Sequence, residues 1–401
     1  FDDPAQELLA SDMLKITFPY ALFISLTALS GSILNIRQKF AVPALTPVLL
    51  NLSLIGAAVW LSPQMENPVT ALAWGVFIAG VAQLLFQIPF LMKAHSLPLP
   101  KLSGAKAGVD RILKLMLPAL FGSSIVQINL LINTIIASYL LAGSISWLYI
   151  SDRFVELPLA LFGIATATVI LPILSKQHVS NQHHAFDQTL QWALKVSLLI
   201  SIPAMLGLLV LSGPILFTLV QYREFSLFDT QMATLSLMAS SLGLPAFIFI
   251  KILAPGFYSR QDTKTPVKIG VFVILINIVL NLLFIGFLPD LKTPGAHAGL
   301  ALVTSFSAYV NATLLYVLLR KSKVLRANPE RLVMALKVIF SSIIMLLCLW
   351  WINPGPEVWA HWNIITRLGS LSGLIIVGIS IYLSLLMLLG LRPSQFRLEL
   401  R

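Results

Sequence analysis

The sequence predicts an all-α protein that crosses a membrane many times. Of its 401 residues, 57% are hydrophobic and only 11% are charged, whereas a soluble domain has roughly 25% charged residues. The mean hydropathy is +0.88, and many apolar runs approach the roughly 20 residues that a helix needs to cross the hydrocarbon core. This composition excludes a soluble enzyme.

Eleven apolar segments follow one another between polar or Pro- and Gly-containing breaks, and each predicts one membrane helix. They cover residues 13–36, 41–62, 69–92, 115–139, 145–174, 190–212, 230–257, 266–288, 298–319, 332–352 and 367–390. The two longest polar stretches between them are 93–114 and 175–189. We expect the first, which carries five cations, to separate two helical bundles.

The positive charges predict the orientation, because cytoplasmic loops carry an excess of Lys and Arg. If the segments alternate in direction, 20 of the 27 Lys and Arg residues lie on one side and only Arg223, Lys292 and Arg367 on the other. We therefore expect a cytoplasmic C-terminus and Phe1 on the outer side. No signal segment precedes the first span, so this orientation predicts a fragment with an odd number of helices missing upstream.

Two short strings repeat in equivalent loops. RQKFAVP (Arg37–Pro43) and RQDTKTP (Arg260–Pro266) both place Pro five residues after Arg-Gln, in a cytoplasmic loop that enters a span. Six spans separate the copies, and this even number preserves their orientation. Parallel repeats of this kind are typical of transporters whose site lies between two halves.

Asp152 and Glu156 are the only acidic residues well inside an apolar segment, and they flank Arg153. Such charges are costly in a membrane and mark functional sites. Two interpretations stay open. Arg153 and Glu156 are three residues apart and form a structural ion pair that locks two helices, or sit at a shorter helix end. Alternatively, Arg153 faces a water-filled cavity and binds an anion such as phosphate, with Glu156 or Asp152 orienting it.

Three amide pairs have a helical spacing of four residues: Gln83 and Gln87, Asn129 and Asn133, and Asn277 and Asn281. One interpretation is hydrogen bonding between helices. The other is a cation site built from side-chain oxygens, to which Thr304 or Ser305 contributes.

Motifs of catalysis and ATP hydrolysis are missing from the sequence. It has no GxxxxGK[ST] loop, no HExxH and no nucleophile with a nearby base. The single Cys348 lies in an apolar run, and His178, His183 and His184 share a polar stretch without metal-ligand spacing. We expect no enzyme, no cofactor and no metal cluster, so that an ion gradient such as sodium, the membrane potential or the substrate's own gradient supplies the energy.

Two segments carry a family resemblance. SDRFVELPLALFGIATATVILPILS, which begins at Ser151, resembles the ADR-x-x-E-x-P segment of the MviN/MurJ family of lipid II flippases. KILAPGFYSRQDTKTPVKI, which begins at Lys251, is similar to that family's LAPGFYARQDT-x-TPV. The family belongs to the superfamily of multidrug, oligosaccharidyl-lipid and polysaccharide exporters.

The resemblance implies a two-lobe fold of 14 helices, of which this chain holds about 11 and lacks the first three. Residues 1–108 would be the second half of the N-terminal lobe, with about three helices. Residues 109–329 would be the C-terminal lobe, with about six helices, and 330–401 two additional helices that form a lipid groove.

The resemblance also implies the activity. Family members flip the undecaprenyl-pyrophosphate-linked peptidoglycan precursor lipid II from the inner to the outer leaflet of the bacterial cytoplasmic membrane by alternating access, in cell wall biogenesis. The expected partners are lipid II and membrane phospholipid, with no nucleic acid, and the expected state is a monomer. Alternatives are an inactive fragment or membrane scaffold, or a related drug or polysaccharide-lipid exporter.

Site residues follow from the matched motifs. Arg153 matches an arginine that the family contributes to a cationic cavity, with Glu156 and Asp152 beside it. Some members bind sodium, and Asn281, Asn277, Thr304 and Asn129 are the candidate ligands here. The second motif places Gly256, Arg260, Gln261, Asp262 and Pro266 in a cytoplasmic loop.

Overall fold

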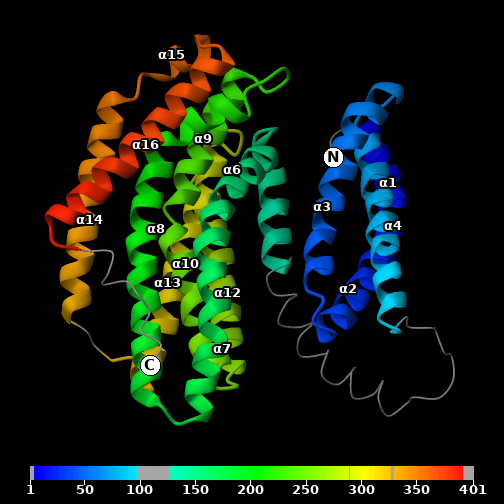
Figure 1. Cartoon of the computed structure of the whole chain (residues 1–401). Helices are drawn as coiled ribbons and strands as arrows, with labels where there is room; N and C mark the ends of the chain where they lie inside the picture. The colour runs from blue at the N-terminus through cyan, green and yellow to red at the C-terminus, as the bar shows by residue number, and fades with distance from the viewer. Residues whose placement is uncertain (1–3, 97–126, 289, 327–328, 392–401) are drawn as a thin grey trace. The chain divides into compact units, whose positions relative to one another are not determined.

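A computed structural model describes residues 4–96, 127–288, 290–326 and 329–391. Every regular element in these residues is a helix, which confirms the all-α prediction (Figure 1). Nine described helices are long and apolar enough to cross a membrane, or ten if one bent pair counts as a single span. The expected segment 115–139 is described only from its helix Gln127–Ser138 onward, so the number eleven stays a prediction.

The chain forms two compact units, Phe1–Val109 (unit 1) and Asp110–Arg401 (unit 2). In unit 1, α4 packs against both α2 and α3. Helices α1 and α2 together form the first candidate span, Pro4–Ile36, which begins nine residues before the expected segment 13–36. The elements of unit 1 are α1 (Pro4–Thr17), α2 (Tyr20–Ile36), α3 (Ala41–Gly56), the π-helical η1 (Ala57–Leu61), the short 3-10 helix η2 (Ser62–Gln64) and α4 (Thr70–Lys93).

Unit 2 starts, in its described part, with helix Gln127–Ser138. It continues with α6 (Ser144–Pro158), the π-helical η3 (Leu159–Ile164), α7 (Ala165–Val179), α8 (His183–Leu219), α9 (Leu227–Ser241), α10 (Leu244–Leu253), α11 (Pro255–Tyr258), α12 (Lys264–Gly286), α13 (Ala296–Lys321), α14 (Pro329–Ile352), α15 (Pro356–His361) and α16 (Ile364–Leu388). Its largest core cluster joins Trp147 on α6 to Ile248 on α10 and Leu319 on α13.

The polar stretch 175–189 between two expected spans is mostly helical and does not form one loop. Helix α7 continues to Val179 and α8 begins at His183, so only residues 180–182 form the turn. His178 therefore lies in the last turn of α7, and His183 and His184 open α8. Polar residues can extend a membrane helix beyond the bilayer, which a cut based on hydropathy does not detect.

The expected single span 230–257 is a bent pair. Helix α9 and the run Leu244–Tyr258 meet at 40°. At the bend, a Cβ on Gly243 would lie 2.7 Å from Ser305 Oγ on α13. The Ser305 hydroxyl donates to the Ala239 carbonyl at 2.9 Å, and the Tyr309 hydroxyl donates to the Leu242 carbonyl at 2.9 Å. Side chains of α13 therefore occupy the break between the two helices.

The last two long helices, α14 and α16, pack on α8 in a second core cluster (Figure 1). Arg367, near the start of α16, is buried and donates to the Phe217 carbonyl at 2.6 Å and to the Ala360 carbonyl at 2.9 Å. These bonds satisfy a carbonyl at the C-terminal end of α8 and fasten α15 and α16 to it.

The repeated strings form the same backbone turn in each unit. Gln38 and Gln261 both adopt left-handed conformations, with φ of 59° and 61°. In unit 1 the Gln38 amide donates to the Asn35 carbonyl and the Lys39 amide to Leu34; in unit 2 the Gln261 amide donates to Tyr258 and the Asp262 amide to Phe257. Each turn thus ends one helix with a Schellman pair of hydrogen bonds.

Candidate functional site

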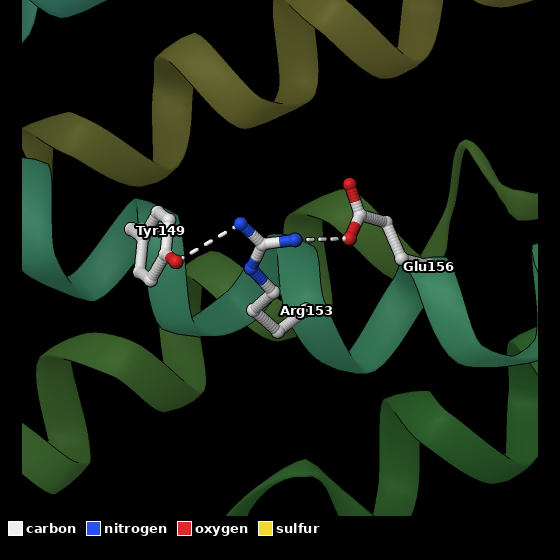
Figure 2. Close-up of polar contacts among 3 residues, drawn as sticks. All are labelled: Tyr149, Arg153 and Glu156. Atoms are coloured by element: carbon white, nitrogen blue, oxygen red, sulfur yellow. Dashed lines mark hydrogen bonds and ion pairs between the residues drawn. The ribbon is translucent and has the colours of Figure 1, made fainter. Parts of the chain in front are cut away.

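Arg153 lies on α6 between two partners of the same helix (Figure 2). Its Nη1 is 2.8 Å from Glu156 Oε2, and its Nη2 donates to the Tyr149 hydroxyl at 2.9 Å. The guanidinium carbon lies 4.6 Å from the centre of the Tyr149 ring. Residues three and four apart share a helix face, and this spacing stretches the Arg153 side chain along the helix.

This ion pair joins no two helices, so the interpretation as a lock between helices is wrong. The side chains of Arg153 and Glu156 are 57% and 58% exposed. Helix α6 begins at Ser144, more than two turns before Arg153, so a shorter helix end is also wrong. Ionisable side chains inside membrane-spanning segments generally face a bundle interior or a water-filled cavity rather than lipid, so this exposed pair is a candidate for contact with a polar substrate.

Asp152 has a different environment from Arg153. It lines a cavity of about 220 Å³, together with side chains of helix Gln127–Ser138, α9 and α13. Neither Arg153 nor Glu156 lines this cavity. The Ser240 hydroxyl lies 3.5 Å from the Asp152 carboxylate. Tyr149, which accepts a hydrogen bond from Arg153, also lines this cavity, so the Arg153–Glu156 pair lies beside the cavity while Asp152 forms part of its wall.

Three of the predicted amides are connected by hydrogen bonds, and one of them, Asn133, lines this cavity. The Asn281 amide nitrogen donates to Asn133 Oδ1 and to Asn277 Oδ1, each at 3.0 Å. Asn277 in turn donates to the Ser307 hydroxyl at 3.2 Å. Asn277 and Asn281 are almost fully buried. The interpretation as hydrogen bonding between helices is thus confirmed for this pair.

The same cavity also has the chemistry of a cation site. Asn129 and Thr304 line it beside Asp152. The side-chain oxygens of Asn129 and Asn281 are buried and accept no hydrogen bond from the described residues. Asn281 does not itself line the cavity, but its hydrogen-bond partner Asn133 does. The Asn129 oxygen and the Asp152 carboxylate are oxygen groups of the kind that hard cations prefer as ligands. Asn133 was already indicated by its spacing of four residues from Asn129, whereas no pattern in the sequence indicated Ser240 as a neighbour of Asp152.

The second motif forms the turn between α11 and α12. Arg260 Nε donates to the Gly256 carbonyl at 2.9 Å, and Asp262 Oδ1 accepts from the Thr265 amide at 3.1 Å. Pro266 occupies the first turn of α12. A Cβ on Gly256 would lie 3.2 Å from Leu319 and 3.3 Å from Leu190, so this glycine allows α11 to pack closely against α13 and α8.

Asp262 is electrostatically stabilised in this turn. Partial desolvation alone would raise the pKa of its carboxyl. Hydrogen bonds from Thr265 and the charge of Arg260 outweigh that effect and hold the pKa below its ordinary value. The carboxylate thus caps the start of α12.

The fold and the charged face of α6 define the class: a helical membrane transporter that exposes an arginine within an apolar span. The particular family follows from comparison with known proteins. This chain belongs to the lipid II flippase MurJ family, whose family model matches residues 1–368. That match begins at residue 1 and gives no support to the expectation of three helices missing before Phe1, which stays a prediction.

Curated relatives cover nearly the whole chain. A protein of Vibrio cholerae named probable lipid II flippase MurJ is 47% identical over 389 residues, which are 97% of this chain and 73% of the relative. The lipid II flippase MurJ of Burkholderia cenocepacia is 37% identical over 97% of this chain and 75% of its own.

Solved structures agree with this assignment. A lipid II flippase MurJ in an inward closed conformation is similar with a TM-score of 0.79 and 29% identity, over 98% of this chain and 77% of that one. An outward-facing MATE family multidrug resistance transporter of the MOP superfamily has a TM-score of 0.57 and 15% identity, over 80% of this chain and 71% of its own. The second likeness concerns the fold alone.

Proposed function

We propose that this chain acts as a lipid II flippase, which moves the undecaprenyl-pyrophosphate-linked peptidoglycan precursor from the inner to the outer leaflet of the bacterial inner membrane. The observation that carries this proposal is family membership along residues 1–368. Such a protein is a transporter and makes or breaks no covalent bond. The alternative, a drug or polysaccharide-lipid exporter, is supported only by the similarity of fold to the MATE transporter.

Arg153 is the residue that we propose to bind the pyrophosphate. Its planar guanidinium can donate two parallel hydrogen bonds to phosphate oxygens. In the absence of substrate, Glu156 and Tyr149 hold the guanidinium extended. A pyrophosphate that approaches this exposed pair competes with Glu156 for Arg153, while Tyr149 keeps its side of the guanidinium fixed.

The cavity beside Asp152 is our proposed coupling site. Asp152 and Asn129, which line it with Thr304, would hold a sodium ion there. Asn281, which bonds the lining residue Asn133, would add its oxygen, and Asn277 would position Asn281 through their hydrogen bond. The carboxylate of Asp152 supplies the negative charge that the amides lack. A bound sodium ion would make the transport cycle depend on the sodium gradient.

The lobes and the orientation complete the proposal. Residues 1–108 would belong to the N-terminal lobe, 109–329 to the C-terminal lobe, and 330–401 to a lipid groove, in a monomer with Phe1 outside and the C-terminus in the cytoplasm. The test uses single cysteines in a Cys348→Ala background. Glu66→Cys and Thr293→Cys should react with an impermeant thiol reagent from outside, whereas Ser96→Cys and Ser322→Cys should not; reversed labelling would refute the orientation.

The central test is Arg153→Ala in cells depleted of their own flippase. We expect flipping to be lost, lipid II to accumulate in the inner leaflet and protein abundance to stay normal, because Arg153 is exposed. Arg153→Lys should keep at most part of the activity, since lysine offers a point charge instead of a fork. Lys251→Ala, which removes another exposed cation from an apolar span, is the matched control and should remain active.

A structural role for Arg153 predicts a different pattern. Arg153→Ala would then lower the amount of protein in the membrane, and Arg153→Ala with Glu156→Gln would restore it by removing the stranded charge. A stable, fully active Arg153→Ala protein would exclude this residue from the site.

A further inference from the structure

Unit 1 contains a polar cavity of its own, which shares no lining residue with the cavity beside Asp152. It has a volume of about 390 Å³ and is bordered by α2, α3 and α4. Its polar lining includes Thr27 from α2, Thr46 from α3, and Gln83 and Gln87 from α4. All four side chains are at least nine-tenths buried.

Thr46 binds both glutamine amides through their nitrogens. Gln83 Nε2 donates to the Thr46 carbonyl at 3.1 Å, and a carbonyl can only accept. The Thr46 hydroxyl donates its single proton to the Val42 carbonyl at 3.1 Å, so it must accept from Gln87 Nε2 at 3.0 Å. The Gln83 amide cannot be turned around without placing its oxygen against the Thr46 carbonyl, and turning the Gln87 amide would require the Thr46 hydroxyl to give up its bond to the Val42 carbonyl.

This arrangement leaves three oxygens without partners. Gln83 Oε1, Gln87 Oε1 and Thr27 Oγ1 are buried and have no hydrogen bond from the described residues. A buried acceptor without a partner costs free energy. A ligand that offers positive charge to all three oxygens would remove that cost.

The charge of the lining limits the kind of ligand. Within the described part of the chain, no acidic or basic side chain lines this cavity. Neutral carbonyl and hydroxyl oxygens coordinate hard cations, but without a carboxylate they do not compensate a double charge in a site of low dielectric. A monovalent ion therefore fits better than a divalent one.

We propose that unit 1 binds a small monovalent cation, of which sodium is the probe, through Gln83 Oε1, Gln87 Oε1 and Thr27 Oγ1. This site is separate from the cavity beside Asp152. It does not depend on the proposed flipping activity, because its residues lie in the other compact unit.

The experiment measures binding of radioactive sodium to the purified 401-residue chain in detergent, with choline as the replacing cation. All proteins in this experiment carry Asp152→Asn, which should weaken sodium binding in the cavity of unit 2. Thr27→Val removes a ligand oxygen but breaks no hydrogen bond within the described protein, so we expect about tenfold weaker binding, as loss of one favourable oxygen contact implies. Thr27→Asp should bind sodium more tightly than the parent.

Ser25→Ala is the matched control. Ser25 lies on the same helix, but its hydroxyl is exposed and donates to the Ala21 carbonyl at 2.7 Å, so its loss should leave sodium binding unchanged. The melting temperatures of the Thr27→Val and Ser25→Ala proteins in choline should agree. If Thr27→Val does not fold, Thr27→Asp decides, since unchanged affinity would contradict the proposal.

Two further results would overturn the site. The Asp152→Asn protein would show no saturable sodium binding if the cavity holds only water. Equal affinity of the Thr27→Val and Ser25→Ala proteins would place the ion elsewhere. If the parent protein binds sodium at this site but does not flip lipid II, the proposed function is wrong and the sodium site is not affected by that result.

Discussion

The two turns that begin with Arg-Gln, one in each unit, share a backbone and differ in what their side chains do. Both end a helix with a left-handed glutamine and the same pair of hydrogen bonds. In unit 2, Arg260 is half-buried, bonds the Gly256 carbonyl and lies 5.5 Å from the Phe257 ring centre. In unit 1, Arg37 is exposed. The comparison teaches that the repeated string specifies a turn, whereas the surrounding packing decides how much that turn contributes.

The largest expected difference between the turns comes from the arginines. Arg260→Ala should lower the free energy of unfolding by about 1–2 kcal/mol, because it removes a charge-assisted hydrogen bond and an aromatic contact. Arg37→Ala should change it by less than about 0.5 kcal/mol, as usual for an exposed residue. Denaturant titration of the purified protein in detergent measures both. Equal losses would mean that the two turns are equally packed.

The glutamines should instead behave alike. Gln38→Gly and Gln261→Gly each relieve a left-handed conformation that glycine adopts without strain, and each should raise the free energy of unfolding by up to about 1 kcal/mol. Both side chains are exposed, so little contact is lost. Melting temperatures of the two variants should rise together. A rise in only one of them would disprove the equivalence of the two backbones.

The smallest expected effect concerns Asp262 and depends on pH. The pKa of this carboxyl is lowered in the folded protein, so its contribution is complete above the ordinary value of about 3.9 and disappears as pH falls through the native pKa. Asp262→Asn should therefore cost about 0.3–0.5 kcal/mol at neutral pH, the usual value of a charge at a helix start. The variant and parent melting curves should converge in acid.

Lys39 occupies the position of Asp262 in the unit 1 turn and provides the reciprocal change. Lys39→Asp should give the start of α3 a carboxylate like the one that caps α12, with a gain of similar size. A loss of stability in this variant would show that the entry into α3 differs from the entry into α12.

Local sequence patterns predicted what depends on neighbours along the chain. Hydropathy located the spans, the spacing of three predicted the Arg153–Glu156 pair, and the repeated string indicated the matching turns. That Asp152 lines the cavity and Arg153 does not was not predictable in the same way. Adjacent residues on a helix point about 100° apart, and which side meets α9 and α13 depends on packing between segments distant in sequence.

The bend between α9 and α10 escaped prediction for the same reason. Gly243 is visible in the sequence. The hydroxyls that bond the carbonyls near it belong to Ser305 and Tyr309, which follow more than sixty residues later. Hydropathy averages over such a break, because both halves are apolar. The different bonding of the two amide pairs was also not predictable, because both pairs have the same spacing of four residues. Gln83 and Gln87 bond Thr46, whereas Asn281 bonds Asn277 and Asn133.

The bend at Gly243 also limits how unit 2 can move. In hydrocarbon, a carbonyl that leaves its helical bond needs another donor, and here the hydroxyls of Ser305 and Tyr309 supply it. Straightening or deepening the bend would strand those carbonyls unless α13 travelled with it. During a transport cycle the broken helix (α9 and α10) and α13 should therefore shift as one rigid body. Any bending within unit 2 should then occur in its other helices and loops.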